Sequence, residues 1–486
     1  GITVAAYGQI GKTFMPTMDE GTVIVGIEKL PSVSLEDSAA LDLKIHKAIM
    51  QAVPEVTGIV ARAGSDELGL DPMGLNQTDT YLLTKPSKEW RRPNDKDWLL
   101  GELRKVLDKL PGISYSFTQP IDMRVQEMII GVRGDVVVKI FGPDIPTLNR
   151  LATQITAKLQ SVNGSEDVRT ILNEGVQYLS VAVNRLNAGR LALNVDDIAE
   201  GLRAQIEGKT LGIVIENGRR TPVLLRGADS VRGSSATFAG LGMTLPNGNV
   251  IPLTSVASLE RIDGPVKIDR ENGRRMALVQ SNVRGRDLVG FVDEAKRVIS
   301  EQVKLPQGYV LAWGGQFENQ QRAAARLGIV VPIALALIFL LLFTTFGSVR
   351  QALLVFVNIP FALIGGVFTL WASGEYLSVP ASIGFIALLG IAVLNGLVLV
   401  SYFNQLRREG ATIDDVVFNG SLRRLRPVLL TASITAFGLV PLLFATGPGS
   451  EVQKPLAIVV TGGLVSSTLL TLIILPLLYR RFGTPK

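Results

Sequence analysis

The sequence predicts an α+β domain followed by an all-α transmembrane bundle of five helices. Three observations support this fold class. Five apolar runs long enough to cross a bilayer occur in the chain of 486 residues, all of them after residue 327. The preceding part has frequent charges and only short apolar runs, as a water-exposed domain has. Within that part, one order of strands and helices occurs twice.

The chain opens with an apolar segment, "GITVAAYGQIGKTFMP", at residues 1–16. This segment is too short to cross a membrane, and it lacks the basic start of a signal peptide. We interpret it as the stub of a transmembrane helix and expect the chain to be a fragment of a longer protein. The sequence contains no cysteine, which excludes disulfides and thiolate metal sites.

Residues 17–134 predict a first α+β module. Its first strand is "VIVGIEKL" at 23–30, and the amphipathic helix that follows has Ser34 as a plausible N-cap. The order strand, helix, strand, strand, helix, strand is that of a ferredoxin-like module. The remaining elements are expected as a helix at 35–53, strands near 56–63 and 77–84, a helix at 95–110 and a strand at 113–118.

A second module of the same kind is predicted for 135–184 and 273–325, interrupted by an insert at 185–272. The insert has its own helix near 195–207, and its Asn-Gly pairs at 217–218 and 247–248 are strong hairpin signals. The module's elements are expected at 135–142 (strand), 145–162 (helix), 168–173, 178–184 and 274–283 (strands), 288–303 (helix) and 309–315 (strand).

The membrane region is predicted at 326–482, and its topology follows from the arginines. The links after the first and third runs and the tail after the fifth carry the basic residues, such as Arg350, Arg407 and Arg480. Basic short loops stay in the cytoplasm, so the large N-terminal region is expected on the outer side. None of the runs contains Asp, Glu, Lys or Arg; they lie at 328–346, 352–371, 380–403, 428–446 and 456–479.

Charge and motif content exclude some classes of function. The formal charge of +6 is partly explained by the basic clusters expected in the cytoplasm, and no basic stretch interleaved with aromatics points to a nucleic-acid partner. The sequence shows no nucleophile–base pair, phosphate loop or paired catalytic carboxylates in a specific context. We therefore expect a transporter and not an enzyme.

Several long stretches resemble the C-terminal half of a resistance-nodulation-division (RND) efflux pump of the heavy-metal branch. The resemblance runs along nearly the whole chain. It is carried by "FMPTMDEGT" (14–22), "TKPSKEW" (84–90), "MRVQEMIIGVRGDVVVKIFG" (123–142), "NVRGRD" (282–287), "GGQFENQQRA" (314–323), "GFIALLGIAVLNGLVLVS" (384–401), "RLRPVLLTA" (424–432) and "ATGPGSEVQKPLAIVVTGG" (445–463).

The resemblance implies a homotrimeric, multi-pass protein of the bacterial inner membrane that exchanges protons for its substrate. Its porter domain and docking insert would lie in the periplasm and join an adaptor protein and an outer-membrane channel. The implied function is the expulsion of divalent heavy-metal cations, with no resident cofactor. The alternatives are a protein-export accessory factor that uses the same porter fold, a copper or silver pump, and a multidrug pump.

Acidic residues of the outer region are the candidate metal ligands. Alternate residues share one face of a strand, so Glu28 shares a face with Gly26 on the first strand, and Asp79 shares a face with Gln77 on another. We select Glu28, Asp79 and Glu127 as the first candidates and Asp71 as the next; each alone is also explained as a solvated surface group. Copper and silver relatives have methionines where this sequence has Gly26, Gln77 and Glu127. Carboxylates suit harder or borderline divalent ions, which favours zinc, cobalt, nickel or cadmium.

Two polar residues inside the apolar runs are candidates for a proton relay. Asn395 matches an asparagine beside the relay lysine of multidrug relatives, and the lysine position is Leu394 here. Thr431 matches a polar position of the same relay. The resemblance places the aspartates of that relay in the other half of the pump. The alternative for Asn395 is a hydrogen bond in helix packing, because Ala392 and Gly396 permit close approach.

Overall fold

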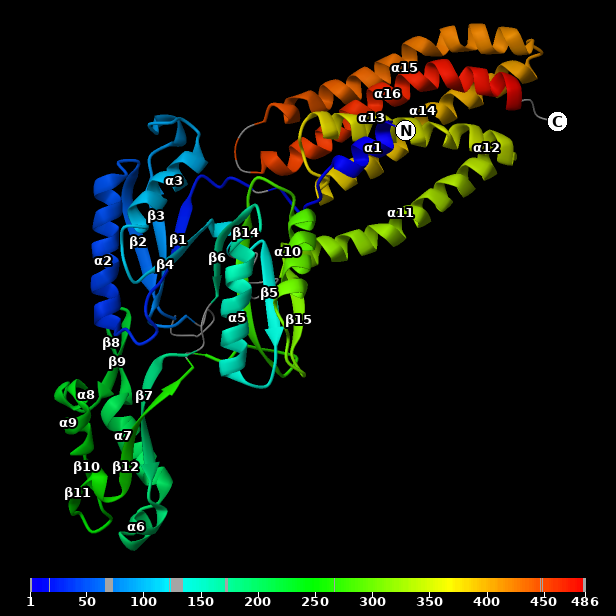
Figure 1. Ribbon diagram of the computed structural model, residues 1–486. Helices are drawn as coiled ribbons and strands as arrows, with labels where there is room; N and C mark the ends of the chain where they lie inside the picture. The colour runs from blue at the N-terminus through cyan, green and yellow to red at the C-terminus, as the bar shows by residue number, and fades with distance from the viewer. Residues whose placement is uncertain are drawn as a thin grey trace. The chain divides into compact units, whose positions relative to one another are not determined.

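The computed structural model describes residues 2–16, 18–65, 73–121, 123, 134–170, 174–265, 267–445, 447 and 449–483 (Figure 1). The chain divides into two compact units. The first comprises Gly1–Leu172 and Ile268–Lys486, and the second comprises Asn173–Lys267. The first unit contains two helix-covered sheets and the apolar helices.

The first sheet is antiparallel, with the strand order β2-β3-β1-β4. One face packs on two helices, where Val23, Val25 and Ile27 meet Ile45 and Leu99 in one core cluster. The intervening residues of β1 therefore face away from the helices. Its elements are β1 (Val23–Glu28), α2 (Leu35–Ala52), β2 (Val56–Ala63), β3 (Gln77–Thr84), α3 (Lys96–Leu107) and β4 (Ser114–Thr118).

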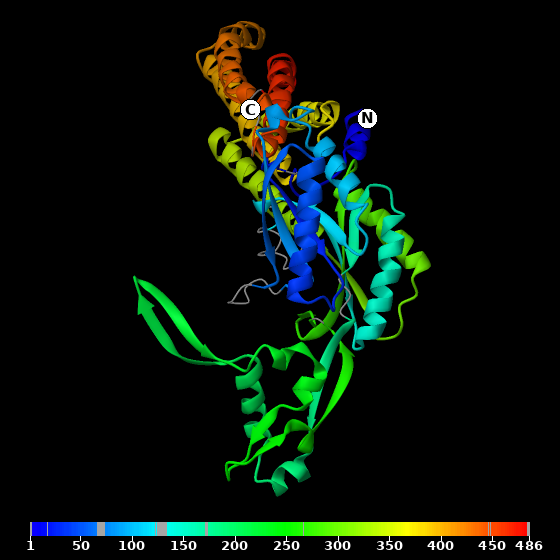
Figure 2. The same cartoon turned by 90° about the vertical axis from the view of Figure 1, so that its left-hand side faces the viewer.

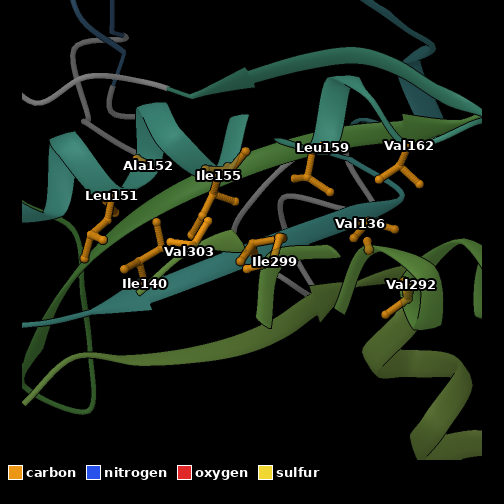
Figure 3. Close-up of a cluster of buried hydrophobic side chains, with 14 of the residues drawn as sticks. Val136, Ile140, Leu151, Ala152, Ile155, Leu159, Val162, Val292, Ile299 and Val303 are labelled. Carbon is orange, nitrogen blue, oxygen red and sulfur yellow. The ribbon is translucent and has the colours of Figure 1, made fainter. Parts of the chain in front are cut away.

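The second sheet repeats this strand order as β6-β14-β5-β15, with β13 (Arg270–Glu271) also paired to β14. Its two helices cover one face, and Figure 3 shows Ile155 and Leu159 of one helix in the same core as Ile299 of the other. Its elements are β5 (Val136–Phe141), α5 (Ile145–Gln160), β6 (Ser165–Thr170), β14 (Arg274–Val283), α10 (Leu288–Gln302) and β15 (Val310–Gly315).

The second unit includes a strand that the sequence placed elsewhere. The strand expected near 178–184 in the second module runs as β7 (Val176–Val183) and pairs with β12 (Ala257–Gly264). An alternating pattern predicts a strand but does not name its partner, which explains the difference. The unit also contains α6 (Arg185–Arg190), α7 (Val195–Ile206), β8 (Lys209–Glu216), β9 (Arg219–Leu225), α8 (Ser230–Gly233), α9 (Ser235–Ala239), β10 (Gly242–Thr244) and β11 (Val250–Pro252).

Strands β8 and β9 form a long hairpin within this unit, visible in green in Figure 2. Its turn is the predicted Asn217-Gly218 pair, and both residues have positive φ values, as a two-residue hairpin turn requires. Every residue of both strands is exposed, including Leu211, Ile213 and Ile215. The hairpin therefore presents apolar side chains that the unit itself does not cover.

Five helices of the described chain are long and apolar enough to cross a membrane, as predicted. The second span is bent, because α12 (Val349–Phe356) and α13 (Asn358–Ala372) meet at Val357. In helices α11 and α15 only 6% of the apolar 18-residue stretch is buried, whereas 44% to 50% of it is buried in the other three spans. The single-helix spans are α11 (Gln316–Phe346), α14 (Val379–Arg408), α15 (Ile413–Leu443) and α16 (Ser450–Phe482).

The N-terminal segment is helical over a shorter stretch than the predicted stub at 1–16. Helix α1 (Ile2–Gln9) packs on the bundle through Ala6, which shares a core cluster with Leu370. The indole Nε1 of Trp371 donates a hydrogen bond to Oε1 of Gln9 over 3.1 Å. Beyond α1 the chain is extended, and Lys12 forms a parallel bridge with Leu377.

Candidate functional site

Glu28 and Asp79, two of the predicted metal ligands, lie on the same face of the first sheet. In the pairing of β1 with β3, Gly26 is opposite Asp79 and Glu28 is opposite Gln77. Glu28 and Asp79 are thus diagonal neighbours, about 7–8 Å apart by sheet geometry. Their face is the one turned away from α2 and α3. Two carboxylates at that separation can reach one cation if their side chains converge.

Asp79 already has a cationic partner. Arg62 is directly opposite Asp79 in the pairing of β2 with β3, and its Nη2 lies 3.0 Å from Oδ2 of Asp79. The same Nη2 lies 3.4 Å from Sδ of Met73. Asp79 is only 1% exposed. A cation that binds Asp79 must therefore share this carboxylate with Arg62 or displace the guanidinium.

The other two predicted ligands, Asp71 and Glu127, lie outside the described residues. Within the described part of the chain, no group of three or more His, Cys, Asp or Glu side chains could hold a metal ion. Glu28 and Asp79 are therefore two acids on one face of the sheet and do not form a complete set of metal ligands. A metal site needs three or more protein ligands, so other residues must supply the rest.

His46, the only histidine, does not belong to this surface. It lies on α2, and its Nε2 is 3.2 Å from Oγ1 of Thr80, whose neighbour Asp79 faces the opposite side of the sheet. Burial lowers the pKa of His46, against the opposing effect of Asp42. The helix-covered side also holds Lys29, which lies 2.7 Å from Asp42 in a buried ion pair.

Asn395 is buried in α14 at 7% exposure. Seven residues earlier Leu388 packs against Gly463, and eight residues later the ring of Phe403 lies 5.0 Å from that of Tyr479. These contacts bring Asn395 level with Thr471 of α16. Among the described residues, neither Nδ2 of Asn395 nor Oγ1 of Thr471 has a hydrogen-bond partner. Buried polar atoms of this kind call for water or an ion.

A second buried asparagine, Asn358, lies beside the same turn of α14. A Cβ added to Gly396 would be 2.2 Å from Nδ2 of Asn358. Glycine is thus required where α13 and α14 approach each other, which supports the packing role weighed for this stretch. Asn358 was not among the predicted site residues, although a lone amide in the apolar run at 352–371 was the available signal.

Thr431 differs from Asn395 in its surroundings. It is exposed on α15, and its hydroxyl donates to the backbone carbonyls of Pro427 and Val428 over 2.9 and 3.0 Å. The hydroxyl is therefore satisfied within its own helix. Its role in a relay remains a prediction.

Comparison with known proteins decides the family. The sequence model of the AcrB/AcrD/AcrF family matches residues 1–483. The chain belongs to this family. The RND resemblance is thereby confirmed.

Proteins similar to this chain include relatives named for cation efflux or metal resistance. The chain is 43% identical over 485 residues to the cation efflux system protein CzcA of Alcaligenes sp. (strain CT14), covering 99% of this chain and 46% of the relative. It is 42% identical to the cobalt-zinc-cadmium resistance protein CzcA of Cupriavidus metallidurans, with the same coverage. A crystal structure of a heavy metal efflux pump superposes with a TM-score of 0.85 at 36% identity, covering 99% of this chain and 49% of that one. The chain thus spans about half the length of the relatives it matches.

Proposed function

We propose that this chain acts as the C-terminal half of an RND pump that expels divalent heavy-metal cations in exchange for protons. The observation that carries the proposal is the alignment of the whole chain, at 42% and 43% identity, with two proteins named for cation efflux or metal resistance. The similar crystal structure, titled as a heavy metal efflux pump, supports the same reading. Neither relative's name suggests protein export.

The proposed porter domain consists of two ferredoxin-like modules. Both sheets have the order expected of that fold, with the first strand between the third and the fourth. We place these modules in the periplasm, because the basic residues gather in the links at the opposite ends of the spans. The protein would lie in the bacterial inner membrane.

The proposed substrate is zinc, cobalt, nickel or cadmium. Thioethers suit monovalent copper, and the positions that carry methionine in copper and silver relatives are Gly26, Gln77 and Glu127 here. Glu28 and Asp79 offer hard oxygen atoms on one surface, and Asp71 and Glu127 are proposed to complete the site. Competition by Arg62 for Asp79 would keep metal binding weak enough for release.

Proton coupling needs a group in the membrane that gains and loses a proton. The five apolar runs contain no Asp, Glu, His, Lys or Arg side chain. Asn395 and Thr431 can accept and donate hydrogen bonds but do not titrate near neutral pH. We therefore propose that carboxylates from the portion of the longer relatives that this chain does not match carry the protons. Asn395 would orient one of them.

We propose that the chain assembles into a homotrimer, and the exposed hairpin β8–β9 is the feature that supports this. Its apolar side chains have no cover within their own unit, and such surfaces mark contacts with other chains. We propose that the predicted insert contacts the neighbouring subunit and the outer-membrane channel, with a periplasmic adaptor completing the complex.

Metal binding to a double variant tests the proposed site. Calorimetric titration with zinc should show that Glu28→Ala combined with Glu127→Ala removes most binding. The matched control combines Glu36→Ala with Glu301→Ala, two exposed acids on α2 and α10. Unchanged zinc affinity in the first double variant discards the site, and tight binding of copper(I) discards the class of metal.

A further inference from the structure

A four-residue extended segment, Gly11–Phe14, forms backbone hydrogen bonds along both of its edges. It connects α1 of the bundle with the first module. On one edge it meets the link between α13 and α14, and on the other it meets the start of α10. Both of its neighbours lie in the same compact unit as the segment itself.

The membrane-side edge carries three hydrogen bonds. The amide of Leu377 donates to the carbonyl of Gly11 over 2.8 Å, and the amide of Thr13 donates to the carbonyl of Leu377 over 3.1 Å. The amide of Val379 donates to the carbonyl of Phe14 over 3.0 Å. The segment thus joins the outer end of the bundle in the manner of a parallel strand.

The other edge is formed by Lys12 alone. Its carbonyl accepts a hydrogen bond from the amide of Val289 over 3.2 Å, and its amide donates to Oδ2 of Asp287 over 3.1 Å. The same oxygen accepts from the amide of Gly290 over 2.8 Å and so caps the N-terminus of α10. One carboxylate oxygen therefore serves the second module and the membrane segment together.

The contact between Gly11 and Asp287 leaves no room for a side chain. A Cβ on Gly11 would lie 2.4 Å from Cβ of Asp287 and 2.9 Å from the ring of Tyr376. Any larger residue must push the segment away from one of its two edges. Glycine here is thus a requirement of close approach and not of backbone conformation.

Asp287 also ends the stretch "NVRGRD" of the second module. Arg284 of this stretch lies 3.3 Å from Glu166 of β6. Arg104 of the first module lies 3.0 Å from the same Glu166 and 3.1 Å from Asp167. Polar contacts therefore link the first module to β6, and β6 to the stretch that ends in Asp287.

We propose that Asp287 is a positioning residue that fastens the Gly11–Phe14 segment to α10 and so transmits movement of the membrane bundle to the second module. This inference rests on the proposed proton-driven transport. The movement is transmitted through Oδ2 of Asp287, and the absence of a side chain at Gly11 permits the close contact. Spatial continuity alone does not prove coupling, so the test must perturb the contact without perturbing the helix cap.

Three variants separate the two roles of Asp287. Asp287→Ser keeps a good N-cap but is too short to reach Lys12, whereas Asp287→Asn keeps one oxygen for both amides. Gly11→Ala leaves Asp287 intact and displaces the segment. The controls are Asp144→Ser, which changes the equivalent cap of α5, and Gly8→Ala, which meets nothing within 4 Å.

Hydrogen exchange of the complete chain in detergent is the first measurement. We expect Gly11→Ala and Asp287→Ser to accelerate exchange of the Lys12 and Leu377 amides about tenfold, and the double variant to add little to either. Asp287→Asn and both controls should leave these amides unchanged. Unaltered exchange in Gly11→Ala and Asp287→Ser overturns the proposal, and so does an Asp287→Asn effect as large as that of Asp287→Ser.

Transport in the pump assembled with the remaining portion of a relative is the second measurement. The two disruptive variants should lose gradient-driven zinc flux while their zinc affinity stays unchanged. Normal flux in them overturns the proposed transmission, whatever the exchange shows. Absence of flux in the unaltered pump counts against the proposed function, and the exchange measurement then judges the positioning role by itself.

Discussion

Arg62 donates a hydrogen bond to Asp79 over 3.0 Å, from a position directly opposite it on the neighbouring strand. Asp79 is almost fully buried, and the side chain of Arg62 is 31% exposed. The acid is therefore neutralised by a partner that remains within reach of solvent. This arrangement makes the proposed metal site competitive, because a divalent cation and the guanidinium need the same oxygen.

Replacing Arg62 should make the first module depend on metal. Arg62→Gln leaves the carboxylate of Asp79 buried without its ion pair, which is expected to lower the free energy of unfolding by about 2 kcal/mol. Zinc should restore the loss, so its stabilising effect in thermal melts should be larger in this variant than in the unaltered chain. The control is Arg92→Gln, since the Arg92 side chain is 66% exposed. If zinc stabilises Arg62→Gln and the unaltered chain equally, Asp79 is not a ligand of the proposed metal site.

The topology can be tested directly because the chain has no cysteine of its own. A cysteine in place of Ser165, on β6, should react with a membrane-impermeant thiol reagent added to intact cells stripped of their outer membrane. A cysteine in place of Glu409, between α14 and α15, should react only after the inner membrane is opened. Labelling of the second site but not of the first in unopened cells would show that the chain has the opposite orientation in the membrane.

The hairpin β8–β9 should be needed for assembly but not for folding. Serine in place of Leu211, Ile213 and Ile215 removes exposed apolar surface, while the core of the unit, built around Ile198 and Leu253, contains none of them. We expect a folded protein that no longer forms trimers in native mass spectrometry. Val250→Ser is the control, because Val250 is equally exposed on β11. Deleting the predicted insert at 185–272 should have the same effect, and a trimer that survives it would refute the assignment.

These predictions depend on features that the sequence reveals unevenly. The five spans follow from apolar runs, and the strand order repeats as the pattern of elements suggested. The pairing of Arg62 with Asp79 could not be predicted, because it depends on the register between two strands. The contact of Lys12 with Asp287 joins residues 275 positions apart, which no local pattern reports.

The intramembrane residues show the same limit. Asn395 attracts notice because an amide is rare in such a run, yet its level with Thr471 depends on how α14 packs on α16. Thr431 lies in an equally apolar run but is exposed on α15. Periodicity does not separate these cases, since α15 buries little of its apolar surface in this chain.

Acidification should stabilise the second module through Asp135. Burial raises the pKa of Asp135, although Arg284 acts in the opposite direction. The folded form therefore binds the proton more tightly than the unfolded form, and stability rises as the pH falls through the folded pKa. Thermal midpoints of the chain in detergent should increase as the pH is lowered from neutrality toward the ordinary pKa of an Asp carboxyl, and Asp135→Asn should reduce that increase. An unchanged increase in the variant would show that Asp135 does not cause it.

We propose that this chain contributes to metal export driven by a proton gradient but does not supply the titrating group. Zinc flux into proteoliposomes with an imposed pH gradient tests it most directly. We expect no gradient-driven flux for the chain alone, and flux once the remaining portion of a relative is supplied. We also expect weaker flux after Asn395→Leu in the assembled pump, and no effect of that change would remove Asn395 from the relay. Gradient-driven flux by the chain alone would show that the chain supplies the titrating group itself.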